Sequence, residues 1–276
     1  MVETKVFNTG ETAQDLKEKY NPEGSLKRRV QLRLLDMLLY LDEVCKKNGL
    51  DYRIDGGTVL GAVRHGGFIP WDDDVDVVIE SSKDYNRLCD YLKNHPHPQY
   101  VLQNDETDKG CIKYWSTLRD LKSEYVHSDP HERAIDCKMK YRGLQIDIFP
   151  YEAGVIPPLY FHYAKLGRKE RYYIVNHFSR ARALHLVRKH ICNPLLHLCS
   201  LLFGNKDMYM HSYGEGFPCM FHKNVLLPHK PILFEGHEFP GPADPKRFCE
   251  VLYRDYLSLP QLDKRTSHLV TYELWD

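Results

Sequence analysis

Three aspartates between residues 72 and 76 have the type and spacing that can bind a metal ion. Asp72, Asp74 and Asp76 occupy alternate positions in the run DDDVDVVI. In an extended strand, alternate side chains share one face and lie about 7 Å apart. Crowded carboxylates are unfavourable unless a cation neutralises them, and oxygen ligands select a hard ion such as Mg²⁺ or Mn²⁺. The sequence therefore predicts a divalent metal site on this strand.

A glycine turn precedes the aspartates and could bind phosphate. Gly56, Gly57 and Thr58 follow a short strand-like segment and open a helical pattern. Backbone N–H groups and a hydroxyl at a helix N-terminus favour anions. Arg64 and His65, a few residues later, could bind the phosphates of the same donor. A phosphate site beside a metal site predicts phosphoryl chemistry.

A further carboxylate, Asp147, lies in the strand-like segment LQIDIF at 144–149. Its isoleucine neighbours share the opposite, apolar face, so Asp147 points away from that face. On a strand beside the first, Asp147 could either complete the metal site or accept the proton of an attacking hydroxyl. Asp74, Asp76 and Asp147 are therefore the candidate catalytic residues.

Simpler explanations exist for each pattern. A glycine pair alone is more often an ordinary turn, and charged residues also protect exposed strand edges. A calcium loop is excluded, because Val77 stands at its obligatory glycine position and Lys83 at its final glutamate. Trp71, Tyr114 and Trp115 could form a cage for a quaternary ammonium group, or could be ordinary core aromatics.

Caps and hydrophobic spacing predict the elements that position these residues. We expect a helix at 26–47, capped by Ser25 and stopped by Gly49, a strand at 52–55, a helical turn at 58–64, a strand at 74–79 and a helix from Ser81 or Ser82 to Asn94. Further on, we expect strands at 111–118, 144–149, 225–227 and 231–239, helices at 160–203, and a helix from Asp244-Pro245 to about Tyr256.

Composition limits the partners and the location. Lysine plus arginine equal aspartate plus glutamate at 38 each, so the protein as a whole has no positive electrostatic field that attracts nucleic acid.

The first residues lack the apolar run of a secretory signal. The most apolar stretch, 191–204, is shorter than the roughly 20 residues that span a bilayer, and we interpret it as a buried helix, with docking on a membrane surface as the alternative. Eight cysteines without a C-x-x-C pair favour the cytoplasm, with the inner face of the membrane as an alternative.

The central segment resembles the LicD family, the phosphorylcholine transferases related to fukutin and fukutin-related protein. The resemblance rests on GGTVLGAVRHGGFIPWDDDVDVVI at 56–79, and is supported by NPEGS at 21–25, QLRLLDMLLYLDEVC at 31–45, IDIFP at 146–150, LFEGHEFPGPAD at 233–244 and YRDYLSLP at 253–260. These segments follow the family's order along nearly the whole chain.

The resemblance implies an α+β fold: a nucleotidyltransferase-like core with a mixed sheet flanked by helices, together with a helical subdomain. We expect an extension at 1–25, the catalytic core at 26–155, the helical subdomain at 156–215 and a C-terminal segment at 216–276. The same resemblance assigns Asp72, Asp74, Asp76 and Asp147 to the metal centre, and Gly56, Gly57 and Thr58 to the donor phosphates.

It also implies a CDP-linked donor of a small alcohol, CMP as leaving group, and transfer of phosphocholine or a similar group to a cell-surface or lipid-linked glycan. Alternatives are transfer of a polyol phosphate or of the nucleotide itself, a glycosyltransferase that uses Asp74-Val75-Asp76, and a catalytically silent binding protein. The basic stretch 165–189 could hold an anionic or lipid-linked acceptor, or could be a solvated helix face.

Overall fold

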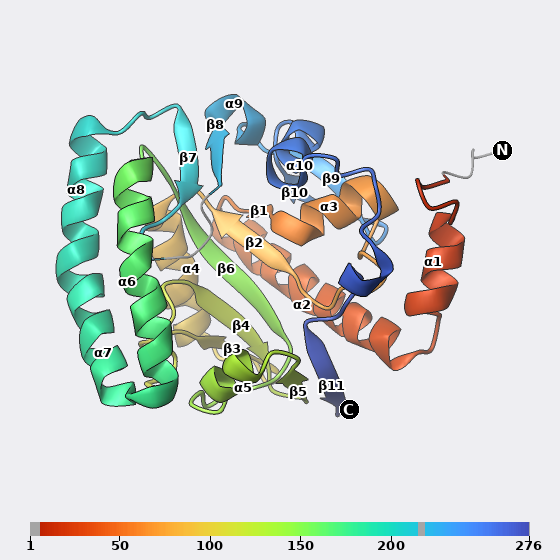
Figure 1. Cartoon of the computed structure of the whole chain (residues 1–276), viewed down its shortest axis with the longest axis horizontal. Coiled ribbons are helices and arrows are strands. Elements are labelled where there is room, and N and C mark those ends of the chain that lie inside the picture. Colours follow the sequence, from red (N-terminus) through yellow and green to blue (C-terminus); the bar gives the residue numbers. More distant parts are fainter. Residues whose placement is uncertain (1–5, 215–218, 276) are drawn as a thin grey trace.

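A twisted mixed sheet forms the centre of the molecule (Figure 1). The computed structural model describes residues 6–214 and 219–275, and within these residues the main sheet has seven strands. In spatial order the strands are β1 (Arg53–Ile54), β2 (Asp76–Ile79), β6 (Gln145–Ala153), β4 (Ser116–Asp120) and β3 (Tyr100–Gln103), while β7 (Met208–His211) pairs with the far part of β6, and β8 (Met220–His222) pairs with β7. β2 and β6 are parallel and the other pairs are antiparallel. The expected α+β fold, a mixed sheet flanked by helices, is confirmed.

The two helices expected from their caps flank this sheet. α2 (Leu26–Asn48) begins where the Ser25 hydroxyl accepts a hydrogen bond from the Arg28 N–H at 3.2 Å, and ends at Gly49 in the left-handed conformation. α4 (Ser82–Asn94) begins at Ser81, which caps the Asp84 N–H. Both helices contact β6 and lie behind the sheet in Figure 1. Local capping signals therefore predicted these boundaries to within a residue or two.

A helical hairpin lies along one edge of the molecule (Figure 1). It consists of α6 (Pro157–Asn176) and of the antiparallel run formed by α7 (Phe178–Val187), the π-helical segment η1 (Arg188–Cys192) and α8 (Asn193–Phe203). The second run keeps helical backbone angles from end to end, and its widened turns come just before Pro194, which cannot donate a backbone hydrogen bond.

The interpretation of 191–204 as a buried helix is wrong. The apolar side of α8 points to solvent, with Leu201 67% and Phe203 78% exposed. Its buried positions are polar instead, among them Asn193 and Ser200. Within the described ranges, no helix combines the length and the apolar character needed to cross a membrane.

The remaining elements differ in part from the expectations. The residues expected as a strand at 225–227 lie largely in a short helix, and the strand expected at 111–118 begins only at Ser116. The other elements are α1 (Ala13–Tyr20), α3 (Gly56–His65), β5 (Ser123–His127), α5 (Pro130–Asp136), α9 (Lys223–Leu226), the hairpin of β9 (Lys230–Phe234) and β10 (His237–Gly241), α10 (Pro245–Tyr253), η2 (Leu262–Lys264) and β11 (Leu269–Leu274).

Two distant segments form a small separate sheet, in which β11 pairs antiparallel with β5. This pairing was not predicted, because nothing local in either segment identifies its partner.

All eight cysteines are free thiols; Cys45, Cys111 and Cys249 are buried as expected of small core residues, whereas Cys137 is exposed.

Candidate active site

Two carboxylates from neighbouring parallel strands form the centre of the site. The register pairs Asp76 of β2 with Asp147 of β6, and the Asp147 N–H donates to the Val75 carbonyl at 3.1 Å. Register partners in a sheet project their side chains to the same face. The sequence expected Asp147 on a neighbouring strand, and the structure places it directly beside Asp76.

The other two predicted aspartates precede the strand. β2 begins only at Asp76, so Asp72 and Asp74 lie in an extended segment rather than in a paired strand. The alternation still holds, because Asp72, Asp74 and Asp76 are partly exposed whereas Asp73 and Val75 between them are buried. The carboxylates of Asp72 and Asp74 each accept the N–H of the following residue, at 3.0 and 2.9 Å. All three therefore share the open face.

The glycine turn lies against these carboxylates. Gly56 has φ +50°, and a Cβ added to it would lie 2.8 Å from Oδ2 of Asp76, while one added to Gly57 would lie 3.2 Å from Oδ2 of Asp72. Only residues without side chains allow the backbone to come this close. The Thr58 hydroxyl accepts the Asp76 N–H at 3.0 Å, which fastens α3 to the start of β2. The N-terminus of α3 and the aspartates thus form one site.

Crowding shifts the protonation of the carboxylates. Burial, with the charge of Asp73, raises the pKa of Asp72 to about 6, although His268 opposes the shift. Burial, followed by the charges of Asp147 and Asp72, raises the pKa of Asp74 to about 7. Burial and the neighbouring carboxylates also raise the pKa of Asp76 well above its ordinary value. Burial and mutual repulsion therefore make the charged form of these carboxylates less favourable than it is in water.

The donor set fits a hard divalent cation in its chemistry. The four predicted ligands, Asp72, Asp74, Asp76 and Asp147, supply oxygen only, and their mutual repulsion is of the kind that such an ion relieves. In the described residues, no three His, Cys, Asp or Glu side chains already converge as a set of metal ligands. Mg²⁺ commonly binds through one or two carboxylates together with substrate phosphates and water, so a complete protein cage is not required.

A fourth aspartate of the run, Asp73, has a structural position that the sequence did not reveal. Its buried carboxylate accepts hydrogen bonds from Lys27 Nζ of α2 at 2.8 Å, from the His268 N–H at 3.1 Å and from the Tyr272 hydroxyl of β11. The strict alternation of the run could have indicated that this carboxylate points opposite to its neighbours. Asp73 therefore anchors the metal-site segment to both α2 and the C-terminal strand.

Asp147 has three polar neighbours. Its Oδ1 accepts the Thr117 hydroxyl at 2.9 Å, its Oδ2 accepts the Gln145 amide at 3.3 Å, and Lys113 Nζ lies 3.7 Å from Oδ1. Lys113 was not among the candidate residues, since a single lysine outside any motif carries no signal in sequence. In the fold, Lys113 is a cation next to the carboxylate centre.

Arg64 and His65 do not lie at the glycine turn. They occupy the last turn of α3, at the opposite end of this ten-residue helix from Gly56. The Arg64 guanidinium is buried and donates to the backbone carbonyls of Tyr256 at 3.1 Å and Ser258 at 3.4 Å, and its Nε contacts His65. The expectation that these two residues bind donor phosphates is therefore not supported by their positions.

A cavity of about 620 Å³ extends from Asp74 and Asp147 towards α5 and α6. Tyr114 and Trp115 line it, but Trp71 does not, so the three aromatics do not form one cage. The ring of Tyr114 is already covered by the Arg188 guanidinium, 4.6 Å from its centre. The cavity is large enough for a small phosphorylated ligand next to the carboxylates.

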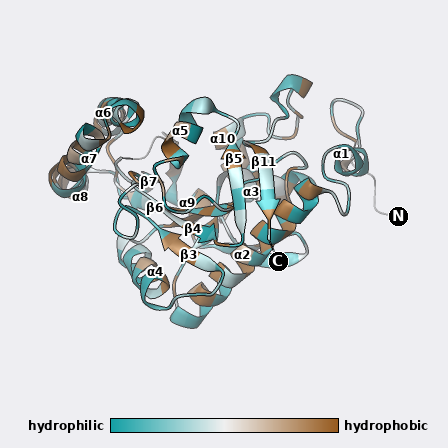
Figure 2. Cartoon of the chain, turned by 90° about the horizontal axis from the view of Figure 1, so that it is seen from below, coloured by the Kyte–Doolittle hydropathy of each residue, from teal (hydrophilic) through white to brown (hydrophobic). Residues whose placement is uncertain are grey.

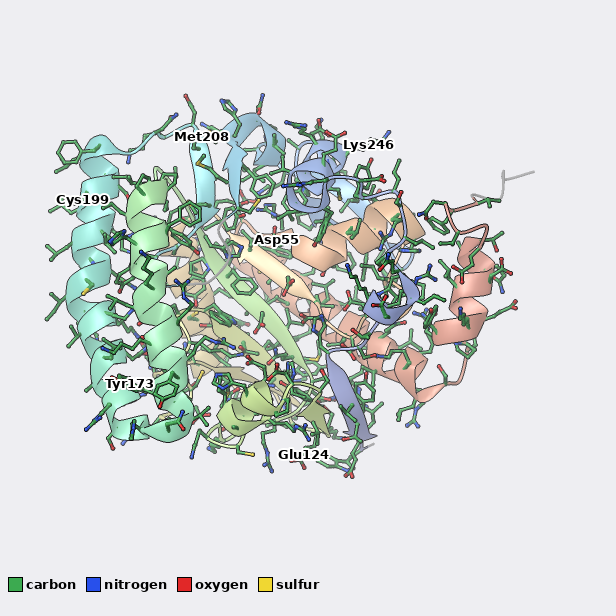
Figure 3. The ribbon with its side chains drawn as sticks, viewed as in Figure 1. Asp55, Glu124, Tyr173, Cys199, Met208 and Lys246 are labelled. Atoms are coloured by element: carbon green, nitrogen blue, oxygen red, sulfur yellow. The ribbon has the colours of Figure 1, made fainter. Side chains whose placement is uncertain are left out.

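Asp55, labelled in Figure 3, lies where β2 passes the start of α3. Its N–H donates to the Asp76 carbonyl at 2.9 Å, and its buried carboxylate pairs with Arg53. Asp55 therefore holds the glycine turn in register with β2, a role that its position at the end of β1 could have indicated.

Comparison with known proteins identifies relatives of this chain. The family described as LicD/FKTN/FKRP, nucleotidyltransferase domain, matches residues 49–198, which is more than half of the chain. The lipopolysaccharide cholinephosphotransferase LicD of Haemophilus influenzae is 31% identical over 142 residues, 48% of each chain. The ribitol 5-phosphate transferase FKRP of Homo sapiens is 50% identical over 40 residues, 14% of this chain and 8% of that protein.

The aligned part of this chain thus spans about half the length of the LicD relative and much less of FKRP. The family match nevertheless contains Gly56, Gly57 and all four candidate metal ligands, and it ends within α8. The chain therefore belongs to the LicD/FKTN/FKRP family.

Proposed function

We propose that this protein transfers phosphocholine, or a similar phospho-alcohol, from a CDP-activated donor to a hydroxyl of a cell-surface or lipid-linked glycan. The observation that carries the proposal is the pairing of Asp76 with Asp147 directly against the glycine turn at Gly56. Two relatives, one named for transfer of choline phosphate and one for transfer of ribitol 5-phosphate, support the class of reaction.

Mg²⁺ or Mn²⁺ is the proposed cofactor, held by carboxylates among Asp72, Asp74, Asp76 and Asp147. When bound, such an ion neutralises charge on the donor phosphates and on the departing CMP. The raised pKa values of Asp72 and Asp74 reflect burial and mutual repulsion that a cation would offset. The core is accordingly proposed to be of the nucleotidyltransferase type.

Backbone and side-chain groups of this protein can bind the donor phosphates and accept the proton of the attacking hydroxyl. The start of α3 lies against the carboxylates of Asp76 and Asp72, and we propose that its N–H groups bind the donor's phosphate oxygens there. Lys113 is close enough to add positive charge beside Asp147. The acceptor oxygen attacks the phosphorus that bears the alcohol, the bond from that phosphorus to the oxygen of CMP breaks, and the hydroxyl proton goes to a carboxylate, for which Asp147 is our candidate.

Transfer of the nucleotide itself is the alternative function. The matched family is described as a nucleotidyltransferase domain, which supports this alternative. In that reaction the acceptor attacks the α-phosphorus of a nucleoside triphosphate and pyrophosphate leaves. The two reactions require the same carboxylates and glycine turn, so the leaving group distinguishes them.

The test is a panel of donors measured by thermal unfolding, with and without Mg²⁺. Ligands that bind the native state raise its stability with the logarithm of their saturation. We expect a metal-dependent rise with one of CDP-choline, CDP-ethanolamine or CDP-ribitol, and release of CMP once a glycan acceptor is added. A response only to UTP with release of pyrophosphate would replace the proposal by nucleotidyl transfer, and a response only to UDP-glucose by glycosyl transfer. Full turnover in the presence of a chelator would exclude the metal.

A further inference from the structure

The helical run from α7 to α8 is amphipathic with its apolar side outward. Its exposed side carries large apolar residues at helical spacing, and these are Leu186, Val187, Ile191, Leu195, Leu198, Leu201, Leu202 and Phe203. Its buried side carries His185, Arg188, Asn193 and Ser200. A helix on the surface of a water-soluble domain normally has the reverse arrangement. Figure 2 shows hydrophobic residues on α7 and α8 at the edge of the molecule.

The inward polar side makes hydrogen bonds and ion pairs with the body of the protein. His185 lies between Glu170 of α6, at 3.1 Å, and Asp105, at 3.2 Å, and the Arg188 guanidinium also pairs with Glu170. These bonds fix the rotation of the helical run about its axis. The apolar side therefore cannot turn inward without breaking a buried ion-pair network, which is strongly unfavourable.

The C-terminal half of the run, α8, is held in the same way. The Asn193 side chain accepts a hydrogen bond from the Tyr163 hydroxyl at 2.6 Å and donates to the Tyr213 carbonyl at 3.1 Å. Ser200 shares a hydrogen bond of 2.7 Å with the Tyr213 hydroxyl. The outward position of the leucines is thus specified by polar contacts along the whole length of the run.

The hairpin is strongly basic although the chain as a whole is neutral. Residues 157–203 contain eight Lys and Arg and one acidic residue, Glu170, which is buried. The side chains of Lys165, Lys169 and Arg180 are exposed and do not line the cavity. A hairpin that carries both an exposed apolar stripe and exposed cations, and has no exposed carboxylate of its own, is complementary to a bilayer that contains anionic lipid.

We propose that the outward face of α7, η1 and α8 is a docking surface for an anionic lipid bilayer, on which the hairpin lies parallel to the membrane plane. The apolar stripe from Leu186 to Phe203 enters the boundary between head groups and acyl chains, and the cations of α6 and α7 contact lipid phosphates. A run of this length covers about 27 Å of membrane surface.

Docking would also orient the catalytic cavity. The opposite side of the hairpin lines that cavity through Ala164, Gly167 and Arg168 of α6. A surface-bound hairpin would hold the cavity close to the bilayer, where a lipid-linked acceptor would be presented. This consequence for the acceptor rests on the proposed function, whereas the docking surface itself does not.

The experiment is flotation of the purified chain with vesicles of phosphatidylcholine alone and of phosphatidylcholine with about 30% phosphatidylglycerol. No donor or metal is added, so the result is independent of transferase activity. We expect the protein to float with the anionic vesicles and to be released by high salt only in part, because the apolar contact is insensitive to salt.

Two sets of variants test the two components. Leu198→Gln with Leu202→Gln changes exposed side chains and should weaken binding at least about tenfold. The matched control, Leu257→Gln with Leu262→Gln, changes leucines that are equally exposed but lie outside the hairpin, and should bind as the unchanged chain does. Lys165→Gln with Lys169→Gln and Arg180→Gln should remove most of the preference for anionic vesicles.

Several results would overturn the proposal. One is the absence of flotation with either vesicle, and another is equal loss of binding in the control variant. A third is a dimer in solution that becomes monomeric in Leu198→Gln with Leu202→Gln while neither form binds vesicles, since the face would then be an interface between copies of this chain. Asp74→Asn should float normally, which separates docking from failure of the proposed catalytic site.

Discussion

Asp76 and Asp147 are register partners on the parallel strands β2 and β6, and their carboxylates therefore lie on one face of the sheet. Gly56 lies so close to this pair that a methyl group added to it would contact Asp76 Oδ2 at 2.8 Å. Charge repulsion and close backbone approach both act against folding unless something is gained in return. Ligand and metal binding is the gain that we propose.

Replacing Asp74 by Asn should reduce turnover by on the order of 10³-fold, the usual scale for loss of a group that stabilises charge in the transition state. The same variant should make the metal-free protein more stable, because it removes one charge from a crowded set in which Asp147 and Asp72 raise the pKa of Asp74. CMP release and thermal unfolding in a chelator measure the two effects. Full turnover in Asp74→Asn would refute the site assignment.

The adjacent residue supplies the control. Asp73→Asn should destabilise the protein by about 3 kcal/mol, because it leaves Lys27 without its buried partner. Neighbouring aspartates would then change stability in opposite directions when made neutral. If both variants melted below the unchanged protein, repulsion between Asp74 and the neighbouring carboxylates would be too weak to lower the stability of the fold.

Replacing Gly56 by Ala should lower turnover and weaken metal-dependent stabilisation, because the new methyl group collides with Asp76. Gly49→Ala is the matched control: Gly49 also has a positive φ, but it ends α2 and has no atom within 4 Å of the position of a Cβ. The control should lose about 1 kcal/mol of stability and keep its activity. Equal turnover in Gly56→Ala and Gly49→Ala would show that the glycine turn does not contribute to catalysis.

The two cations Arg64 and Lys113 should give opposite results. Arg64→Gln should cost about 2 kcal/mol of stability and leave the donor KM unchanged, because it loses its bonds to the carbonyls of Tyr256 and Ser258. Lys113→Gln should lower turnover at least about tenfold with little change in stability, since it removes positive charge beside Asp147. A raised donor KM in Arg64→Gln alone would restore the role expected from the sequence.

Stability should depend on pH through His185. Burial lowers the pKa of this histidine, but its bonds to Asp105 and Glu170 outweigh burial and raise the pKa above 6.5. A raised folded-state pKa stabilises the fold fully below pH 6.5, and this contribution is lost as pH rises through the folded value. The difference in melting temperature between the unchanged protein and His185→Gln should therefore be largest below pH 6.5 and shrink as the pH rises above that value. A difference that grew with pH would contradict the assigned pairing.

The parts of the fold with local signals could be predicted from sequence. Ser25 and Gly49 fixed the ends of α2 because capping depends on adjacent residues. The alternation of Asp72, Asp74 and Asp76 indicated their common face even though only Asp76 is in the strand. Their spacing required nothing beyond an extended backbone.

The parts that depend on distant partners could not be predicted. Arg64 looked suitable for phosphate because the sequence did not show that α3 carries it away from the glycine turn. The leucines of α8 suggested a buried helix, and only the polar network around Glu170 reveals that they face outward. Lys113 became a candidate only once the fold had brought it to Asp147.

The anchoring of Asp73 has a consequence for the order in which the molecule folds. Lys27 and Tyr272, which hold this carboxylate, are 245 positions apart in the chain. Contacts between residues so far apart in sequence form slowly, because closing the long loop between them costs chain entropy before the contact stabilises the fold. Until β11 has formed, the segment that carries Asp72, Asp74 and Asp76 therefore lacks the contact between Asp73 and Tyr272, although Thr58 and β6 already hold its other end. The last strand of the chain thus completes the support of a metal-site segment that lies near the chain's beginning.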